Sequence, residues 1–107
     1  MSQIELTLLT KQDCHLCVEA KAVVARVLSA AENSDIPVVY KEVDIDDNAD
    51  FADKYADDIP VVLLNGKPHA SFYVYEDKLA YAILHERDRL LRHKTSWWRR
   101  KFGSKTN

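Results

Sequence analysis

Residues 4–17 read IELTLLTKQDCHLC and place two cysteines between segments of different hydrophobic period. The alternation from Ile4 to Leu9 has period two, which is typical of a β-strand. From Leu16 to Ala31 the apolar residues recur with the spacing of an amphipathic helix. The sequence therefore predicts that Cys14 and Cys17 lie where a strand leads into the beginning of a helix.

A second strand and a short helix are expected next along the chain. Val38 to Val43 is rich in residues that favour strands. Asp46 and Asp47 are placed to cap a short helix, in which Phe51 and Tyr55 are one turn apart. The first strand, the long helix and the second strand then form a βαβ unit, whose two strands are expected to be parallel.

A hairpin and a final helix complete the predicted fold. Pro60 to Leu64 is an apolar strand, and Asn65-Gly66 tolerates the positive φ angles of a type I′ turn. The next strand, near Lys67 to Tyr75, is therefore expected to be antiparallel. Pro68 suits an edge strand, because proline cannot donate a hydrogen bond to a neighbouring strand. A helix is expected to begin at Glu76. Its predicted buried stripe consists of Leu79, Ala80, Ile83, Leu84, Leu90 and Leu91.

The predicted order of elements is βαβαββα over residues 1–92. This order indicates an α/β fold with a mixed four-stranded sheet and helices on both faces. The 107 residues suffice for one domain with one core, and residues 93–107 form a basic and aromatic C-terminal tail.

Two classes of segment are missing from the sequence. No run approaches the roughly 18 to 20 consecutive apolar residues of a membrane-spanning helix. The first residues lack the basic, apolar and small-residue regions of a secretory signal peptide. We therefore expect a cytoplasmic protein without a transmembrane segment.

The formal net charge of −2 conceals an uneven distribution. Residues 1–85 hold 15 acidic and 7 basic side chains, whereas residues 86–107 hold 2 acidic and 8 basic ones. The acidic body argues against nucleic acid as a partner. The tail carries Trp97 and Trp98 among cations, which suits weak contact with a membrane surface or an anionic partner, or folding of the two indoles onto the domain.

Both cysteines belong to one motif, Cys14-His15-Leu16-Cys17. The beginning of a helix presents unpaired N–H groups and the positive end of the helix dipole, which stabilise a thiolate. Because the second cysteine is about one turn further along, it is placed to close a disulfide with the first. The motif predicts a reversible dithiol. A protonated His15 would favour the Cys14 thiolate, whereas Asp13 would oppose it or cap the helix.

Other roles for the cysteines are open at this point. They are buried apolar packing, a zinc site, and a cluster that bridges two chains through Cys14. Zinc normally takes four ligands, but His69, His85 and His93 are scattered singly. The seven aspartates of residues 44–58 lack the glycine and glutamate of a calcium-binding EF-hand loop. No metal site is therefore predicted within one chain.

The segment from Thr10 to Cys17, followed later by Asp58-Ile59-Pro60-Val61 before the Asn-Gly turn, resembles the glutaredoxin-like proteins of the thioredoxin-fold superfamily. The resemblance covers about residues 3–92 and implies a thioredoxin-like fold. It further implies that the Ile59–Pro60 peptide bond is cis and that the backbone of Ile59 is free to pair with an extended substrate.

The resemblance also implies roles for single residues. Cys14 corresponds to the attacking thiol and Cys17 to the resolving thiol. Lys11 matches a lysine that in glutaredoxins lies near the thiolate and a carboxylate of glutathione. With His15, these considerations give a set of candidate substrate-binding residues, namely Lys11, His15, Ile59 and Pro60.

Two functions from different classes follow as hypotheses. The first is a glutaredoxin-like thiol–disulfide oxidoreductase that uses Cys14 and Cys17 to reduce protein disulfides or glutathione mixed disulfides. It would hold no bound cofactor and would take glutathione as a candidate co-substrate. The alternative is a non-enzymatic binding module on the same fold, which acts through the basic aromatic tail.

Overall fold

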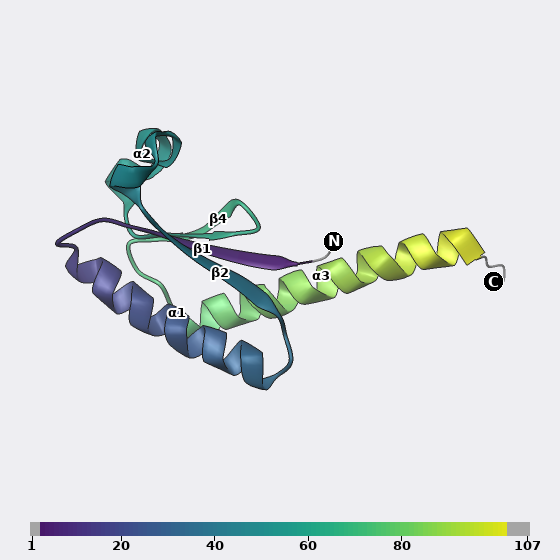
Figure 1. The fold of residues 1–107 in the computed structure, drawn as a ribbon. Coiled ribbons are helices and arrows are strands. Elements are labelled where there is room, and N and C mark those ends of the chain that lie inside the picture. The colour runs from purple at the N-terminus through teal and green to yellow at the C-terminus, as the bar shows by residue number, and fades with distance from the viewer. Residues whose placement is uncertain (1–2, 103–107) are drawn as a thin grey trace.

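The computed structural model describes the backbone of residues 3–102 and the side chains of residues 3–92. Within this part of the chain, four strands form one sheet in the order β2-β1-β3-β4 (Figure 1). The parallel pairing of β1 with β2 and the antiparallel pairing of β3 with β1 and β4 confirm the predicted mixed sheet. The strands are β1 (Ile4–Thr10), β2 (Val38–Asp44), β3 (Val61–Leu64) and β4 (Lys67–Ser71).

The helices and strands follow one another in the predicted order βαβαββα. The α-helices are α1 (His15–Asn33), α2 (Ala49–Tyr55) and α3 (Glu76–Phe102). Two single turns of 3₁₀-helix flank α2, namely η1 (Ile45–Asp47) and η2 (Ala56–Asp58). The α/β fold class is therefore confirmed.

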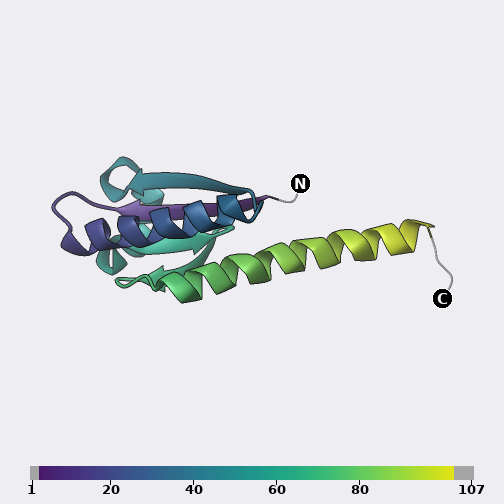
Figure 2. The same cartoon turned by 90° about the horizontal axis from the view of Figure 1, so that it is seen from below.

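The helices lie on both faces of the sheet, as predicted. Figure 2 shows α1 and α3 side by side on one face, where α1 contributes Ala20, Val24, Val27 and Ala31 to the core. The opposite face is covered near the end of β1 by α2, through Phe51, Ala52 and Tyr55. The strand residues facing α1 and α3 include Ile4, Leu6, Leu8 and Val62, and those facing α2 include Leu9, Val61 and Leu63.

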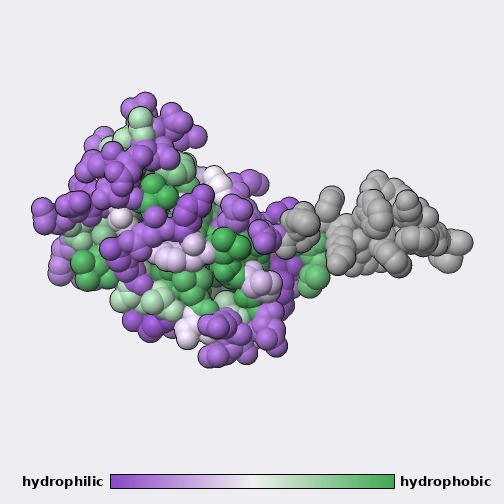
Figure 3. All heavy atoms as spheres, viewed as in Figure 1, coloured by the Kyte–Doolittle hydropathy of each residue, from purple (hydrophilic) through white to green (hydrophobic). Residues whose placement is uncertain are grey.

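The caps around α2 differ from the prediction. Asn48, not Asp46 or Asp47, is the N-cap of α2, and its side chain accepts a hydrogen bond from the N–H of Phe51 at 3.0 Å. The two aspartates form the 3₁₀ turn η1 instead, which Asp44 caps. Hydrophilic side chains cover much of the outer surface around α2 (Figure 3).

The Asn-Gly hairpin forms as predicted. Asn65 and Gly66 have φ angles of +51° and +82°, the positive values that a type I′ turn requires. Pro68 lies in β4, which is an edge strand of the sheet. However, β4 ends at Ser71 and not near Tyr75, because the backbone turns sharply at the next residue.

The last helix differs from the prediction in its buried stripe and in its length. Leu84 and Leu91 are exposed, whereas Leu79 and Ile83 are buried. The α3 backbone continues past residue 92 to Phe102 and extends beyond the sheet (Figure 2). The side chains of the predicted tail, residues 93–107, lie outside the described residues. In residues 3–102, no helix combines the length with the apolar composition that a membrane-spanning segment requires.

Candidate functional site: a disulfide at the beginning of a helix

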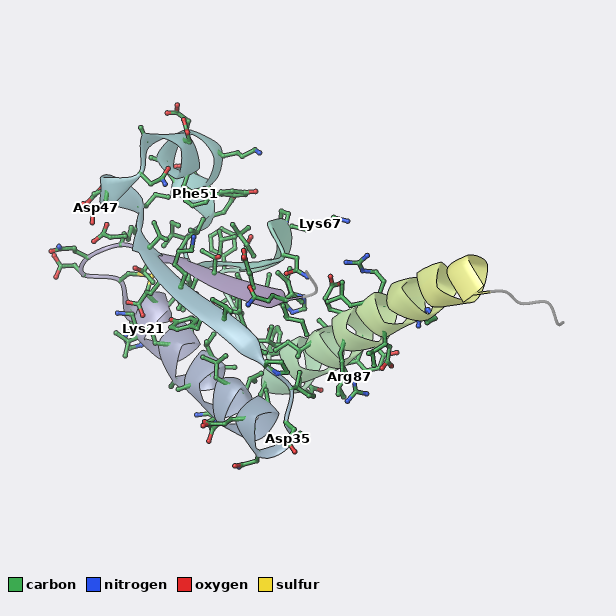
Figure 4. The ribbon with its side chains drawn as sticks, turned by 45° about the vertical axis from the view of Figure 1, so that its right-hand side comes forward. Lys21, Asp35, Asp47, Phe51, Lys67 and Arg87 are labelled. Atoms are coloured by element: carbon green, nitrogen blue, oxygen red, sulfur yellow. A yellow bond between two sulfur atoms is a disulfide. The ribbon has the colours of Figure 1, made fainter. Side chains whose placement is uncertain are left out.

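Cys14 and Cys17 form a disulfide at the beginning of α1, with their Cα atoms 5.2 Å apart. A short loop connects the end of β1 to this point. Figure 4 shows the disulfide as a yellow bond at that end of α1, with Asp47 and Phe51 on the segment that follows β2. The predicted pairing of the two cysteines is therefore seen in the structure.

The two cysteines differ in exposure. Cys17 is 2% exposed and packs in the cluster that fills the space under α2, together with Leu9 and Ile59. Cys14 is half-buried at the edge of the same cluster. Only Cys14 is therefore accessible to a bulky disulfide without movement of the helix.

Cys14 is itself the N-cap of α1. Its Sγ accepts a hydrogen bond from the backbone N–H of Cys17 at 3.1 Å. The sequence offered Asp13 for this role, but Asp13 lies one residue earlier, with an exposed side chain and a φ angle of +56°. The first turn of α1 contains no acidic side chain that would offset the positive end of the helix dipole. Both features favour a negative charge on the Cys14 sulfur after reduction.

The two candidate cations near the dithiol lie in solvent. The side chain of His15 is 85% exposed, and its Nε2 is 3.1 Å from Oε2 of Glu19, one turn further along α1. Lys11 is exposed in the loop between β1 and α1. The roles of His15 and Lys11 at the site stay predictions, and the effect of a charge at such exposed positions is screened by salt.

Ile59 and Pro60 lie beside the dithiol. The Ile59–Pro60 peptide bond is cis, both side chains are buried, and Ile59 packs in the same cluster as Cys17. Within residues 3–92, no hydrogen-bond partner is found for the N–H or C=O of Ile59. The C=O of Pro60 accepts a hydrogen bond from the N–H of Phe72 at 2.8 Å. The structure thus brings Cys14, Cys17, Ile59 and Pro60 together.

Comparison with known proteins places this geometry in a family. Residues 5–84 match the glutaredoxin-like domain family (DUF836). The chain belongs to this family. It is also 31% identical over 85 residues to the "Glutaredoxin-like protein YDR286C homolog" of Dictyostelium discoideum, an alignment that covers 75% of each chain.

Two thioredoxins are among the solved structures with a similar architecture. Chloroplastic thioredoxin z is 14% identical, with a TM-score of 0.64 over 81% of this chain and 80% of that one. The thioredoxin of Fasciola hepatica is 22% identical, with a TM-score of 0.56 over 79% of this chain and 82% of that one. The glutaredoxin-like chain therefore has the thioredoxin fold that its resemblance implied.

The remaining functional-site hypotheses concern metals. Among the described residues of the glutaredoxin-like chain, no three His, Cys, Asp or Glu side chains are grouped so as to hold a metal ion. In this structure the two cysteine sulfurs are bonded to one another. The arrangement suits thiol–disulfide chemistry, in which the attacking and resolving groups are both sulfur atoms.

Sequence reasoning missed one residue next to the site. Phe72 is 42% exposed and has a φ angle of +68°, a left-handed conformation that bulky side chains rarely adopt. Nothing in the sequence identifies this conformation, because it arises where the end of β4 meets Pro60. A glycine or asparagine at this position would have given a signal, but a phenylalanine does not.

Proposed function

We propose that this glutaredoxin-like protein is a thiol–disulfide oxidoreductase that reduces protein disulfides or glutathione mixed disulfides. The proposal is carried by one observation. A disulfide-forming pair lies at the beginning of a helix, with the first sulfur half-buried at the edge of the fold and the second 2% exposed behind it. In such an arrangement the first cysteine is accessible to the substrate. The buried second cysteine is placed to resolve the mixed disulfide by attack on the first.

The chemistry proceeds by two exchanges at sulfur. The Cys14 thiolate attacks one sulfur of the substrate disulfide, the substrate S–S bond breaks, and the departing thiolate takes a proton from water. Cys17, after releasing its proton to water, then attacks Sγ of Cys14; the bond between Cys14 and the substrate sulfur breaks, and the second substrate thiolate leaves and takes up a proton. The protein is left with the Cys14–Cys17 disulfide, and the substrate has gained two electrons.

The cycle closes when an external thiol returns two electrons to the Cys14–Cys17 disulfide. Glutathione or a dithiol protein is the class of reductant that this step requires, and the cytoplasm is the compartment that supplies it. No bound cofactor takes part in either exchange.

The backbone of Ile59 supports this proposal, because it is available to bind a polypeptide substrate. Its N–H and C=O lack partners within the described residues, and its side chain packs with Cys17. An extended polypeptide that pairs with these two groups would bring its own sulfur next to Cys14. Binding through backbone atoms is independent of the substrate sequence, which suits an enzyme that acts on disulfides.

The test is to interrupt the second exchange. In Cys17→Ser, attack by Cys14 still occurs but resolution does not, so a covalent mixed disulfide with a disulfide-containing peptide or with glutathione disulfide accumulates. Intact-protein mass spectrometry measures the adduct. Cys14→Ser is the matched control and forms far less adduct, because its remaining sulfur is buried. Equal adduct in both variants, or none in Cys17→Ser, would overturn the proposal.

A further inference from the structure

The end of β4 holds an aromatic residue in a strained conformation next to Pro60. The N–H of Tyr73 donates to the C=O of Ser71 at 2.7 Å, which makes Phe72 the central residue of a γ-turn. With its φ angle of +68°, this is the rare form of the turn, which is unfavourable for any residue with a side chain. Glycine would relieve the strain, yet the chain has phenylalanine here.

This strained turn is fixed directly to the site. The N–H of Phe72 donates to the C=O of Pro60 at 2.8 Å, one residue after Ile59 in the cluster that contains both cysteines. The Phe72 side chain is 42% exposed and does not belong to either core cluster of the described residues. Core packing therefore does not account for the aromatic ring at this position.

A second exposed apolar side chain lies on α1. Val18 is 65% exposed and follows Cys14 by four residues, so the two share one face of the helix, one turn apart. Two exposed apolar residues thus adjoin the site, namely Phe72, which is bonded to Pro60 at the end of β4, and Val18, one turn after Cys14 on α1. These are suited to contact an apolar side chain of a substrate.

The same end of the molecule is strongly acidic. Residues 10–19 and 44–59 contain nine aspartates and glutamates, with Lys11 and Lys54 as the only lysines or arginines. These segments meet near the two cysteines, because Thr10 is in register with Asp44 at the ends of the parallel strands, and Cys14 and Cys17 pack in one cluster with Ile45 and Phe51. Asp57 and Asp58 directly precede Ile59. A substrate that approaches Cys14 therefore enters a negative potential.

We infer that the site selects polypeptide disulfides that carry basic residues and an apolar residue next to the cysteine, in preference to glutathione. This inference rests on the proposed thiol–disulfide exchange. A basic polypeptide is attracted to the acidic segments, whereas glutathione carries one more carboxylate than ammonium groups and is repelled. Phe72 contacts the apolar residue beside the substrate cysteine while the substrate backbone pairs with Ile59.

The experiment compares three disulfide dimers of one synthetic octapeptide that contains a single cysteine. The first has lysines around Leu-Cys, the second has glutamates in place of the lysines, and the third has lysines with glycine in place of leucine. Reduced protein is mixed with each dimer or with glutathione disulfide, and liquid chromatography measures the released thiol. At low ionic strength we expect the lysine peptide to react about tenfold faster than the glutamate peptide, and the ratio to fall as salt is added.

Variants then assign the preference to residues. Phe72→Gly keeps the turn, since glycine accepts the positive φ angle, and is expected to slow the leucine peptide about fivefold relative to the glycine peptide. Phe72→Tyr restores the rate. Tyr81→Ala is the matched control, because Tyr81 is also exposed but lines a cavity with Lys67 and Pro68 at the other end of β4.

The acidic segments are tested by neutralisation. Asp57→Asn combined with Asp58→Asn is expected to reduce the lysine-over-glutamate preference, whereas Asp35→Asn in the loop between α1 and β2 leaves it unchanged. Alkylation of Cys14 by neutral iodoacetamide reports whether the thiol itself is intact in each variant. An unchanged peptide preference in Phe72→Gly and in the double aspartate variant would overturn the inference.

The two proposals fail in distinguishable ways. If reduced protein turns over glutathione disulfide as fast as the lysine peptide, the substrate preference is wrong and the oxidoreductase proposal stands. If the protein reduces none of the disulfides although Cys14 is alkylated normally, the oxidoreductase proposal is wrong and the preference falls with it.

Discussion

The backbone N–H of Cys17 donates to Sγ of Cys14 across the first turn of α1, at 3.1 Å. After reduction, the same N–H and the end of the helix stabilise a thiolate at Cys14. In Cys17→Ser, the rate of Cys14 alkylation should therefore reach half its maximum at a pH below the roughly 8.5 of a free thiol. Mass spectrometry of iodoacetamide-treated protein over a range of pH measures this midpoint.

Unfolded protein serves as the reference for this measurement. In concentrated urea the helix is lost, and the alkylation midpoint of Cys14 should return to that of an ordinary cysteine. A folded midpoint equal to the unfolded one would show that the helix end does not outweigh the opposing effect of Asp13 and the other carboxylates at this end of the molecule.

Local patterns were enough to predict most of the fold. The period-two and helical segments around Cys14 gave the βαβ unit, and Asn65-Gly66 gave the hairpin, because turn chemistry depends on adjacent residues. The errors are at boundaries that tertiary contacts decide. β4 ends at Ser71 because the chain turns at Phe72, where Tyr73 N–H bonds back to Ser71, and the N–H of Phe72 fixes this turn to Pro60, which is distant in sequence.

In the candidate site, too, some features follow from local sequence and others depend on tertiary contacts. The pairing of Cys14 with Cys17 follows from their spacing, and it could be predicted. The difference in exposure between them depends on packing against Ile59, which is 42 residues after Cys17 in the chain. The γ-turn at Phe72 likewise depends on the pairing of β4 with β3, so no local sequence pattern predicts it.

Asn65 connects three elements of the fold. Its N–H and side-chain oxygen bond to the C=O and N–H of Glu5, each at 2.8 Å, and its side-chain N–H bonds to Glu86 of α3. Asn65→Ala removes the side-chain bonds and places alanine at a positive φ angle, so we expect a loss of about 1–3 kcal/mol in the free energy of unfolding. Urea denaturation measures the loss.

Asn65→Gly separates the two contributions. Glycine accepts the φ angle of +51° but makes no side-chain hydrogen bond, so its loss should be smaller than that of alanine. If both variants are as stable as the natural protein, the connection between the hairpin, β1 and α3 contributes nothing measurable.

Glu86 should make stability depend on pH in the acidic range. The hydrogen bond from Arg89 lowers the pKa of its carboxyl, burial opposes this, and the bond from Asn65 lowers it further. Because this pKa is lower in the folded protein, the stabilisation is complete above the ordinary glutamate pKa and is lost as the pH falls through the lowered value.

Glu86→Gln isolates the contribution of Glu86 to the pH dependence of stability. Glutamine does not titrate, and all other carboxyl groups are the same in the variant and the natural protein. The difference in urea midpoint between the natural protein and Glu86→Gln should shrink as the pH is lowered from 6 to 3. A difference that stays constant over that range would show that Glu86 titrates alike in the folded and unfolded protein.

Deletion of residues 96–107 should leave the thiol chemistry intact. Among the α3 residues whose side chains are described, those that pack against the core include Leu79, Ile83 and Leu90, which precede the deletion, and α3 leads away from the disulfide end of the fold (Figure 1). We expect the Cys14 alkylation rate of the shortened protein to stay within about twofold of the full chain, since neither the helix end nor the cluster around Cys17 changes. The rate is measured by mass spectrometry beside a thermal unfolding scan. A loss of reactivity in a shortened protein that unfolds at the normal temperature would show that the C-terminal segment acts at the dithiol.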